Sequence, residues 1–258
     1  MMETITSRKN PLCAHFRKLA SSRAYREETG EFLCDSPKLL QEADLWGATV
    51  RAVLFTEGIR LPPLADKGTR LVQVSESVME AVSPMETPQG VVFSCLMGRS
   101  EPPARLERGR YLLLEGVQDP GNVGTILRTA DAFEVDGLFL LEGCADLYNP
   151  KTVRAAMGVH FRRPVWRCSL DRAAELVKGA GLPMYGAALR EDTLDVRQVD
   201  LSAAAVMIGS EGRGLSPAAL EACTATVKIP MSPRCESLNA AAAATVLLWE
   251  MARGRQTK

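Results

Sequence analysis

Three polar segments carry side chains whose types and spacing could do chemistry on a bound ligand. In the first, Asn122 and Arg128 stand six residues apart in Asp119-Pro-Gly-Asn-Val-Gly-Thr-Ile-Leu-Arg128. Asp-Pro-Gly-Asn favours a tight turn, and the apolar spacing after it predicts a helix with Arg128 off the core face. With Asn122 in the turn and Arg128 about one turn into the helix, both could reach one polar substrate. The same residues also fit a turn asparagine and a surface arginine without a chemical role.

The second segment, Gly209-Ser-Glu-Gly-Arg-Gly-Leu-Ser216, contains three glycines, which allow a backbone to approach a ligand closely. It is not G-x-G-x-x-G, and the chain has no G-x-x-x-x-G-K-[ST], so neither common phosphate-binding fingerprint is present. Glu211 also argues against a pyrophosphate site, because its carboxylate would repel the ligand. Ser216 followed by Pro217 predicts the start of a helix.

The third segment runs from Ile229-Pro-Met231 to Ser237-Leu-Asn239 and enters a run of alanines at 240–244. We expect Ser237 to cap a C-terminal helix, and the alanines to allow something to pack close to it. Taken alone, both features have a purely structural explanation.

The elements that must position these segments follow from the apolar pattern after residue 109. Short apolar strands alternate there with helical stretches, which indicates a parallel sheet covered on both faces. The predicted strands are YLLLEGV, GLFLL, PMYGAAL, AAVMI and TATVKIP, and the predicted helices are GTILRTADAFEV, residues near 150–158, LDRAAELVKGAG and one from Ser237. Ligands of such sheets bind at the carboxyl ends of strands, so the three segments lie where a site is expected.

A polar, charged, proline-containing stretch precedes this region and predicts a linker at 98–108. We therefore expect a small α/β domain at 1–97 and a larger α/β domain at 109–258. In the first, VRAVLFTEG and GVVFSCLM are interpreted as buried strands, and Leu12, Phe16 and Leu19 form one stripe of a helix.

Composition excludes several classes of protein. The 258 residues include 31 Lys plus Arg and 31 Asp plus Glu, with 46% hydrophobic and 24% charged residues, which is typical of globular chains and not of disordered or membrane proteins. The seven cysteines form no C-x-x-C pair, so we expect no disulfide framework and no metal, but small core residues in a reducing cytosol. The first twenty residues lack an apolar signal region, and we expect a cytoplasmic protein without membrane contact.

Positive charge is concentrated in two islands although the net charge is zero. Residues 1–26 carry six basic side chains against one acid, and 151–172 carry the same ratio. Such islands fit a local polyanion site, because phosphate binding depends on nearby charge, or solvated helix faces. The residues of the first island that we expect to contact such a polyanion are Arg8, Lys9, Arg17, Lys18 and Arg23.

Together, the three segments resemble the motifs of the SpoU family of ribose 2′-O-methyltransferases in the SPOUT superfamily. The family pattern is N-x-G-x-x-x-R-x-A, then G-x-E-x-x-G, then I-P-M with S-L-N, and this chain supplies Asn122 to Ala130, Gly209 to Gly214, Ile229 to Met231 and Ser237 to Asn239. The resemblance spans about residues 109–254. FLCDSPKLLQEA and the TPQG at 87–90 more loosely resemble the family's N-terminal substrate-binding domain, which is similar to RNA-binding ribosomal proteins.

The resemblance implies a parallel sheet tied in a deep trefoil knot, whose loops hold S-adenosylmethionine. Carried over by position, Gly209, Ile229 and Leu238 would bind this cofactor, with Leu189 or its neighbours as a further wall. It also implies a homodimer formed through the knot domain, with the alanine-rich helix as an interface element.

The implied reaction is attack of a ribose 2′-oxygen on the methyl group of the cofactor, which needs close approach and help with proton loss. Arg128 is the family's catalytic candidate, either as the base or, while charged, as a stabiliser of the developing alkoxide. The residues implied to orient Arg128, the ribose or its phosphate are Asn122, Glu211, Ser237 and Asn239. His15 and His160 fit RNA contact or packing better than catalysis.

The sequence therefore predicts an RNA 2′-O-methyltransferase that acts on ribosomal RNA, with transfer RNA as the alternative substrate. A non-enzymatic RNA-binding or assembly factor on the same fold is a second hypothesis, against which the retained Asn122, Arg128 and Glu211 speak. A nicotinamide-dependent oxidoreductase is a third, and the missing dinucleotide fingerprint argues against it.

Overall fold

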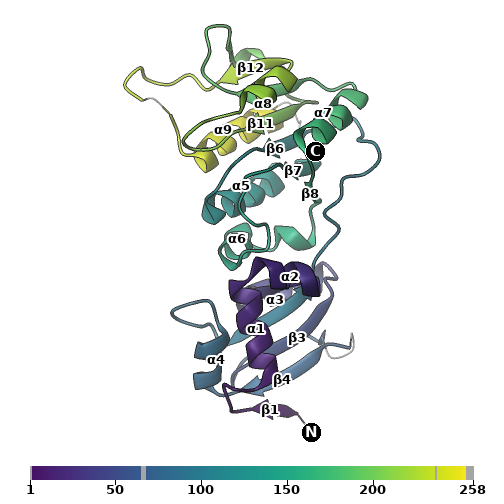
Figure 1. The fold of residues 1–258 in the computed structure, drawn as a ribbon, viewed down its shortest axis with the longest axis vertical. Coiled ribbons are helices and arrows are strands. Elements are labelled where there is room, and N and C mark those ends of the chain that lie inside the picture. Colours follow the sequence, from purple (N-terminus) through teal and green to yellow (C-terminus); the bar gives the residue numbers. More distant parts are fainter. Residues whose placement is uncertain (1, 65–67, 236, 254–258) are drawn as a thin grey trace. The chain divides into compact units, whose positions relative to one another are not determined.

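The computed structural model describes residues 2–64, 68–235 and 237–253, and the chain forms two compact units. The first comprises residues 1–98 and 146–162, and the second comprises residues 99–145 and 163–258. The sequence-based division places all residues after 109 in one domain, whereas the structure groups 146–162 with the N-terminal unit. Figure 1 shows the ribbon and labels most of the elements of both units.

The N-terminal unit is built on a five-stranded sheet of order β1-β4-β3-β5-β2. Strands β1, β4 and β3 are parallel, and β5 runs antiparallel to its neighbours β3 and β2. Its elements are β1 (Glu3–Ile5), α1 (Pro11–Ser21), α2 (Arg23–Thr29), β2 (Glu31–Asp35), α3 (Pro37–Leu45), β3 (Val50–Phe55), β4 (Arg70–Val74), α4 (Glu76–Val82), β5 (Val91–Leu96), α6 (Pro150–Ala156) and η2 (Val159–Phe161).

Helix α1 forms because Asn10 caps it and Pro11 stands in its first turn, where a missing N–H costs nothing. Phe16 and Leu19 are fully buried against strands β3 and β4, and Leu12 packs at the edge of the same cluster. The predicted helical stripe and the two predicted buried strands are confirmed.

The second unit is built on a seven-stranded sheet of order β10-β12-β9-β11-β6-β7-β8, and all neighbouring pairs are parallel. Five of these strands are predicted from the sequence, whereas the two short edge strands β8 and β10 are not. The elements are β6 (Tyr111–Leu114), α5 (Pro120–Ala132), β7 (Gly137–Leu140), β8 (Val165–Arg167), α7 (Leu170–Gly179), β9 (Met184–Ala187), β10 (Leu194–Asp195), η3 (Val196–Gln198), β11 (Ala205–Ile208), α8 (Pro217–Ala222), β12 (Ala225–Lys228) and α9 (Ala240–Ala252).

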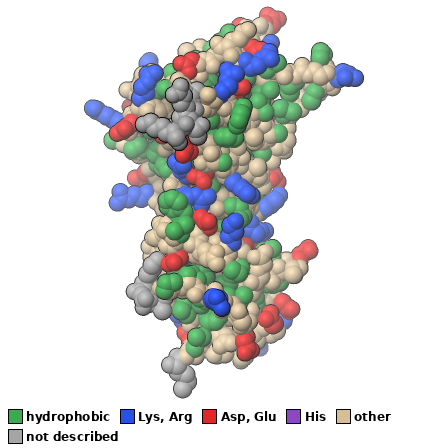
Figure 2. Space-filling view, turned by 180° about the vertical axis from the view of Figure 1, so that it is seen from behind, with side chains coloured by type: hydrophobic (Ala, Val, Ile, Leu, Met, Phe, Trp, Pro, Cys, Tyr) green, Lys and Arg blue, Asp and Glu red, His purple; other side chains and the backbone are tan. Residues whose placement is uncertain are grey.

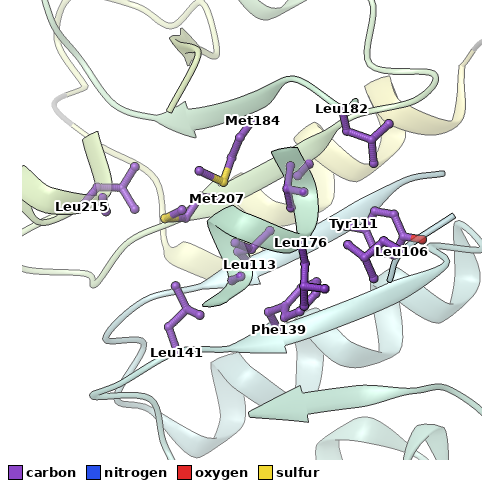
Figure 3. Packing of buried hydrophobic residues seen from close by; sticks show 14 residues of the cluster. Leu106, Tyr111, Leu113, Phe139, Leu141, Leu176, Leu182, Met184, Met207 and Leu215 are labelled. Atoms are coloured by element: carbon purple, nitrogen blue, oxygen red, sulfur yellow. The ribbon is translucent and has the colours of Figure 1, made fainter. Parts of the chain in front are cut away.

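Helices cover both faces of this sheet. On one face, residues of α7 and α8 pack with alternate residues of the strands, including Leu113, Phe139 and Met207 (Figure 3). The residues between them, such as Leu112 and Leu138, are also fully buried, because α5 and α9 pack together on the other face (Figure 1). The α/β fold with a parallel C-terminal sheet is confirmed.

The C-terminal helix begins two residues later than predicted. Asn239, not Ser237, is its N-cap, and its side-chain oxygen accepts from the N–H groups of Ala241 and Ala242. Either residue type can cap a helix, and the backbone path decides which one does. Within the described ranges, no helix is long and apolar enough to cross a membrane.

Candidate functional site

Three loops meet at one edge of the seven-stranded sheet. Strands β12, β9 and β11 are parallel neighbours, so the loops after their carboxyl ends lie side by side. A cavity of about 420 Å³ opens between these loops, and the first two turns of α9 close its remaining side. The sequence-based expectation that the site lies at the strand ends corresponds to this cavity.

All four residues that the resemblance implies for cofactor binding line this cavity. Leu189 follows β9, Gly209 follows β11, Ile229 follows β12, and Leu238 precedes α9. Leu189 is 63% exposed and Leu238 is 37% exposed, so apolar side chains stand open at the rim of the cavity. Exposed apolar surface of this kind is what a ligand with an aromatic ring covers.

The loop after β11 is closed on itself by two backbone hydrogen bonds between Ser210 and Gly214. This closure explains Gly209: a Cβ there would lie 2.1 Å from the carbonyl carbon of Gly214. Gly214 has a positive φ of 66°, which favours glycine. A Cβ at Gly212, in contrast, would have nothing within 4 Å. Two of the three glycines are therefore required by the loop's own geometry.

A chain of side-chain hydrogen bonds joins the three motifs at the rim of the cavity. Asn239 Nδ2 donates to Asn122 Oδ1 at 3.2 Å, and Asn122 Nδ2 donates to Glu211 Oε1 at 2.8 Å. These residues are 117 and 89 positions apart in sequence. The tertiary fold thus brings together three of the five predicted catalytic residues.

Helix capping determines which groups donate and which accept in this series of hydrogen bonds. Asn239 Oδ1 accepts from two N–H groups at the start of α9, at 2.9 and 3.3 Å, so its amide nitrogen must face Asn122. Asn122 therefore presents its oxygen to Asn239 and its nitrogen to Glu211, whose carboxylate can only accept when ionised. Each group in the chain has one orientation that satisfies its neighbours.

Asn122 lies in the first turn of α5, not in the preceding turn as expected from the sequence. Asp119 is the N-cap, and its carboxylate accepts from the backbone N–H of Asn122 at 2.9 Å. Pro120 occupies the first helical position, where its fixed φ starts the helix immediately. The turn-forming residues Pro-Gly-Asn are thus the beginning of the helix itself.

Arg128 is exposed and lies apart from the cavity in this chain. It stands six residues beyond Asn122 on α5, about 9 Å along the axis and about 120° around it. It lines neither this cavity nor the one that adjoins it, and its side chain has no hydrogen bond or ion pair with residues that the structure describes. Ser237 lines the cavity, but it makes no side-chain contact with Asn122 or Glu211 within the same described part.

Glu115, which follows β6 directly, is a site residue that the sequence motifs do not include. Its two carboxylate oxygens accept from the backbone N–H and the hydroxyl of Ser216, at 2.8 and 2.6 Å. Ser216 is the predicted N-cap of α8, and its hydroxyl also accepts from Ala219 N–H. Glu115 thereby holds the far end of the glycine-rich loop. The sequence signal that could have identified Glu115 is an acidic residue directly after an apolar strand.

A second cavity, of about 630 Å³, adjoins the first. It shares the stretch from Ser210 to Gly212 with the first cavity and extends to Glu115 and Gln118 at the end of β6. Glu211 borders both cavities. Molecules bound in the two spaces would face the same carboxylate.

Two cysteines near the site have thiols with raised pKa values. Burial raises the pKa of the Cys144 thiol, and it raises the pKa of Cys223 to about 11, so neither supplies a thiolate at neutral pH. Three cysteines are fully buried as expected, but Cys235 is exposed in the loop before α9, which corrects the prediction for that residue. Among the described residues, no group of His, Cys, Asp and Glu could hold a metal ion.

The cavity fits the cofactor that the resemblance implies. Its volume lies within the range of about 300–1,000 Å³ that small-molecule sites show. Apolar walls from Leu189, Ile229 and Leu238 suit an adenine ring, and Gly209 has no side chain to keep a ligand away from the backbone. Small residues of α9, Ala240 and Ala243, leave room on the remaining side.

In the N-terminal unit, the five predicted RNA-contacting residues are all exposed, in the turn before α1, on α1 and at the start of α2. Arg26, part of the same basic island, is not available: it is 3% exposed and binds Asp146 Oδ2 and the carbonyl of Leu19. Basic and acidic side chains are interspersed on the face shown in Figure 2. His15 and His160 both pack within this unit, in agreement with the packing interpretation.

The second basic island is mostly neutralised by internal ion pairs. In the N-terminal unit, Arg154 pairs with Asp35 and Arg162 with Glu42. In the second unit, the pairs are Arg163 with Asp131 and Arg172 with Glu175. Arg154, Arg162 and Arg163 therefore use their charge in contacts within their units, and the polyanion interpretation is wrong for these three arginines, whereas Arg172 and Glu175 form an exposed surface pair.

Comparison with known proteins agrees with the motifs and with the geometry. Residues 109–249 match the SpoU rRNA Methylase family, and residues 2–92 match the MRM3-like substrate binding domain. The chain is 35% identical to 23S rRNA (guanosine(2553)-2'-O)-methyltransferase RlmP of Bacillus subtilis, over 97% of this chain and 99% of that protein.

Two solved structures have the same fold over nearly the whole chain. An AdoMet-bound rRNA methyltransferase from Sinorhizobium meliloti has a TM-score of 0.88 and 29% identity, and 99% of each chain is covered. The SpoU methyltransferase AviRb from Streptomyces viridochromogenes, in complex with AdoMet, has a TM-score of 0.82 and 30% identity over 95% of this chain and 98% of that one. The chain therefore belongs to the SpoU rRNA methylase family, and the fold class, methyltransferase activity and S-adenosylmethionine cofactor that its motifs predicted are confirmed.

Proposed function

We propose that this protein transfers a methyl group from S-adenosylmethionine to the 2′-hydroxyl of a ribose in ribosomal RNA, in the cytoplasm. The observation that carries the proposal is the hydrogen-bonded chain Asn239–Asn122–Glu211 at the rim of a cavity of about 420 Å³. Relatives named as ribosomal RNA methyltransferases over nearly the full chain favour ribosomal over transfer RNA. We assign RNA binding to 1–97 and methyl transfer to 109–258, joined by 98–108.

Within the site, Leu189, Gly209, Ile229 and Leu238 would hold the cofactor, which supplies an electrophilic methyl group on sulfur. We place the acceptor ribose in the adjoining cavity, because the two spaces share Glu211. Asn122 and Asn239 fix the position of the Glu211 carboxylate, which then orients the acceptor hydroxyl by accepting its hydrogen bond. Ser237, which lines the cofactor cavity, would contact the acceptor ribose or its phosphate where the two cavities adjoin.

Arg128 would act on the acceptor oxygen, as the base or as a stabiliser of the alkoxide. Since Arg128 is exposed and outside both cavities of its own chain, we propose that a homodimer brings it to the site of a second copy. The exposed stripes support this arrangement: Thr125, Arg128 and Ala132 on α5, and Ala242, Thr245 and Trp249 on the neighbouring α9. Trp249 is 58% exposed, as expected of an interface anchor.

The N-terminal unit would contact RNA through Arg8, Lys9, Arg17, Lys18 and Arg23. These side chains are exposed, and two of them form surface ion pairs, Arg8 with Glu80 and Arg23 with Glu27, which a phosphate can replace easily. Reversal of Arg17, Lys18 and Arg23 to Glu should weaken RNA binding and flatten its salt dependence, measured by anisotropy across salt concentrations. Unchanged affinity would leave these residues as a solvated face.

The proposal is tested with Arg128→Ala. We expect loss of methyl transfer from tritiated S-adenosylmethionine to total ribosomal RNA by a factor of about 100 or more, because proton removal or charge stabilisation is lost. Calorimetry should show cofactor affinity within about threefold of wild type, since Arg128 does not line the cavity. Full activity of the variant would overturn the role of Arg128, and no transfer by the wild-type protein to any RNA would overturn the function.

A further inference from the structure

The N-terminal unit contains a hollow of about 320 Å³ that the methyl-transfer site does not use. It lies where the first turns of α1 cross the sheet, and its walls include Leu12, His15, Glu31, Arg51, Arg70 and Ser94. The residues come from α1 and from the four strands β2, β3, β4 and β5. Four of the five strands of the sheet therefore contribute to the hollow.

Small residues in one row of the sheet create this hollow. Ala52 on β3 pairs with Ser94 on β5, and its other neighbour in the row is Arg70 on β4. Large apolar residues fill the rows further along the same face, such as Leu54 and Val92, where α1 packs tightly. With only a methyl group and a hydroxyl in the middle of its row, the sheet leaves a space under α1.

The floor of the hollow carries a polar group without a partner. Ser94 is 0% exposed, and its hydroxyl has no hydrogen bond with any described residue. A buried hydroxyl without a partner costs free energy, and few such groups are kept in native proteins. A valine would suit this strand position without that cost. The hydroxyl thus faces a space in which a ligand group can bind it.

The rim offers both acceptors and donors. Glu31 is held by His15, whose Nε2 lies 3.2 Å from Glu31 Oε2, while Tyr25 holds the other ring nitrogen at 3.0 Å. Arg51 is 59% exposed and its Nε lies 4.0 Å from Glu31 Oε1. The register of β3 shifts between Val50 and Ala52, and such a bulge re-aims the side chain at the extra residue, here Arg51. The Glu31 carboxylate, the Ser94 hydroxyl and the Arg51 guanidinium thus border the same hollow.

We propose that this hollow binds one unpaired nucleotide of the RNA substrate, with its base inside and its phosphate on Arg51. The proposal rests on the proposed function, and it adds a base-reading site to the N-terminal unit. The amino group of a base donates to Glu31, a ring nitrogen or carbonyl of the base accepts from Ser94, and Leu12 covers the base plane. Proteins that read RNA by sequence commonly take up single unstacked bases in this way.

The charges of the rim favour a nucleotide over a simple anion. A phosphate or sulfate ion inside the hollow has only acceptor atoms to offer and would lie against the Glu31 carboxylate, which repels it, whereas a nucleotide turns its base to Glu31 and keeps its phosphate outside on the exposed Arg51. Adenine, cytosine and guanine carry an amino group that Glu31 can accept from. Uracil has no amino group, and its N–H lies between two carbonyl oxygens that the carboxylate repels. We therefore expect uridine to bind most weakly.

The direct test is a set of amide correlation spectra of the full-length protein, titrated separately with the four nucleoside 5′-monophosphates and with inorganic phosphate. The amide signals of Glu31, Ala52 and Ser94 should shift with AMP, CMP and GMP, less with UMP, and not with phosphate. Readout at these residues separates the hollow from nucleotide binding at the cofactor cavity. No shift with any nucleotide, or an equal shift with phosphate, would overturn the proposal.

Variants connect the hollow to the RNA substrate. Ser94→Val removes the hydroxyl and narrows the floor of the hollow, and it should raise KM for ribosomal RNA by about tenfold, with kcat within about twofold and cofactor affinity unchanged. Ser94→Ala keeps the space but removes the hydroxyl. Because that hydroxyl has no partner among the described residues, the thermal midpoint of the variant should not fall, while KM rises by a smaller factor. Arg51→Ala should also raise KM, and the exposed Arg60→Ala in the same unit is the matched control.

The outcomes separate the two proposals. A wild-type protein that methylates ribosomal RNA, together with a folded Ser94→Val variant of unchanged KM, would overturn the nucleotide site and leave the enzyme function intact. A wild-type protein that methylates no RNA would overturn the proposed function, and the amide titration would then decide about the hollow alone.

Discussion

At the scale of single residues, Asn239 and Asn122 have different roles because they occupy different positions in their helices. Asn239 is an N-cap, so its oxygen is committed to backbone N–H groups of α9. Asn122 lies inside the first turn of α5, so its whole carboxamide is available to link Asn239 with Glu211. A helix start thereby determines the orientation of an amide, and the amide positions a carboxylate at the cavity.

This relation predicts different effects of two substitutions at Asn239. Asn239→Ala loses the cap and should lower the unfolding midpoint by about 2–4 °C, as expected for a loss of about 1 kcal/mol. Asn239→Asp keeps a capping oxygen and should unfold within about 2 °C of wild type, but it places an acceptor opposite the Asn122 Oδ1, which is itself an acceptor, so this hydrogen bond is lost. Both variants should lose about tenfold or more in methyl transfer. An active Asn239→Asp would show that the amide relay is not needed.

His160 predicts how stability depends on pH. Burial is the main cause that lowers its pKa to about 4, and the ring nitrogen Nδ1 has no partner in the described part of the chain. The folded state therefore keeps His160 neutral, whereas the unfolded chain takes up a proton at a pKa of about 6.5. Stability contributed by the neutral form is complete above about pH 6.5 and falls as the pH drops towards 4.

Urea unfolding at pH 7 and pH 4.5 measures this effect. Between these values the wild-type protein should lose on the order of 2 kcal/mol through His160. In His160→Phe, which matches the rings of Phe32 and Tyr148 around it, the loss between the two pH values should be smaller by that amount. Identical pH profiles for the two proteins would contradict the buried neutral histidine.

At the scale of elements, the parallel sheet gathers loops from distant parts of the sequence at one edge. The order β12-β9-β11-β6 places the ends of four strands in a row, and each of the predicted motifs follows one of these strands. The loop after β11 is rigid because Ser210 and Gly214 bond to each other and Glu115 holds Ser216. A rigid loop of this kind costs little ordering entropy when a ligand binds.

Gly209 and Gly212 of this loop should tolerate substitution by alanine differently. Gly209→Ala would place a Cβ 2.1 Å from Gly214, so the loop must open, and cofactor affinity measured by calorimetry should fall by about tenfold or more. Gly212→Ala has nothing within 4 Å of its Cβ and should bind the cofactor within about threefold of wild type. Equal affinities of the two variants would mean that loop closure does not shape the cavity.

At the scale of the whole molecule, the outer surfaces of α5 and α9 form one exposed area. Small residues there surround Trp249, whose ring packs edge-on against Phe133 with ring centroids 5.8 Å apart. An exposed tryptophan on a supporting aromatic ring is typical of an interface centre. A homodimer through this area would also place Arg128 close to a second copy, as the proposed reaction requires.

Sedimentation velocity tests the homodimer. Trp249→Ala should shift the protein from dimer to monomer at micromolar concentration and reduce methyl transfer, whereas Trp46→Ala, an exposed tryptophan of the other unit, should leave the dimer intact.

A mixing experiment tests the shared site. Equal amounts of Arg128→Ala and Glu211→Gln, each inactive alone, should regain about a quarter of wild-type activity, because half of the dimers are mixed and each of these has one intact site. A wild-type monomer, or no recovery on mixing, would overturn the composite site.

The sequence by itself determined the identity of the motifs, the alternation of strands and helices and the apolar stripe of α1, because these are local patterns set by side-chain type and spacing. It also placed the three loops at strand ends, since parallel strands present their carboxyl ends on one edge. It could not assign the helix cap to Asn239 rather than Ser237, because both can cap and the backbone path selects one. It missed the short edge strands β8 and β10, whose few residues carry little pattern.

Only the tertiary structure decided which charges are free and which groups meet. Arg26 and Arg154 belong to sequence-defined basic islands, yet both pair with carboxylates more than 110 residues away. The contact of Asn122 with Glu211, and the hollow beneath Ser94, likewise depend on strand order and register. Such contacts join residues that lie far apart in the sequence. They form only when the chain has folded, so local sequence patterns cannot predict them.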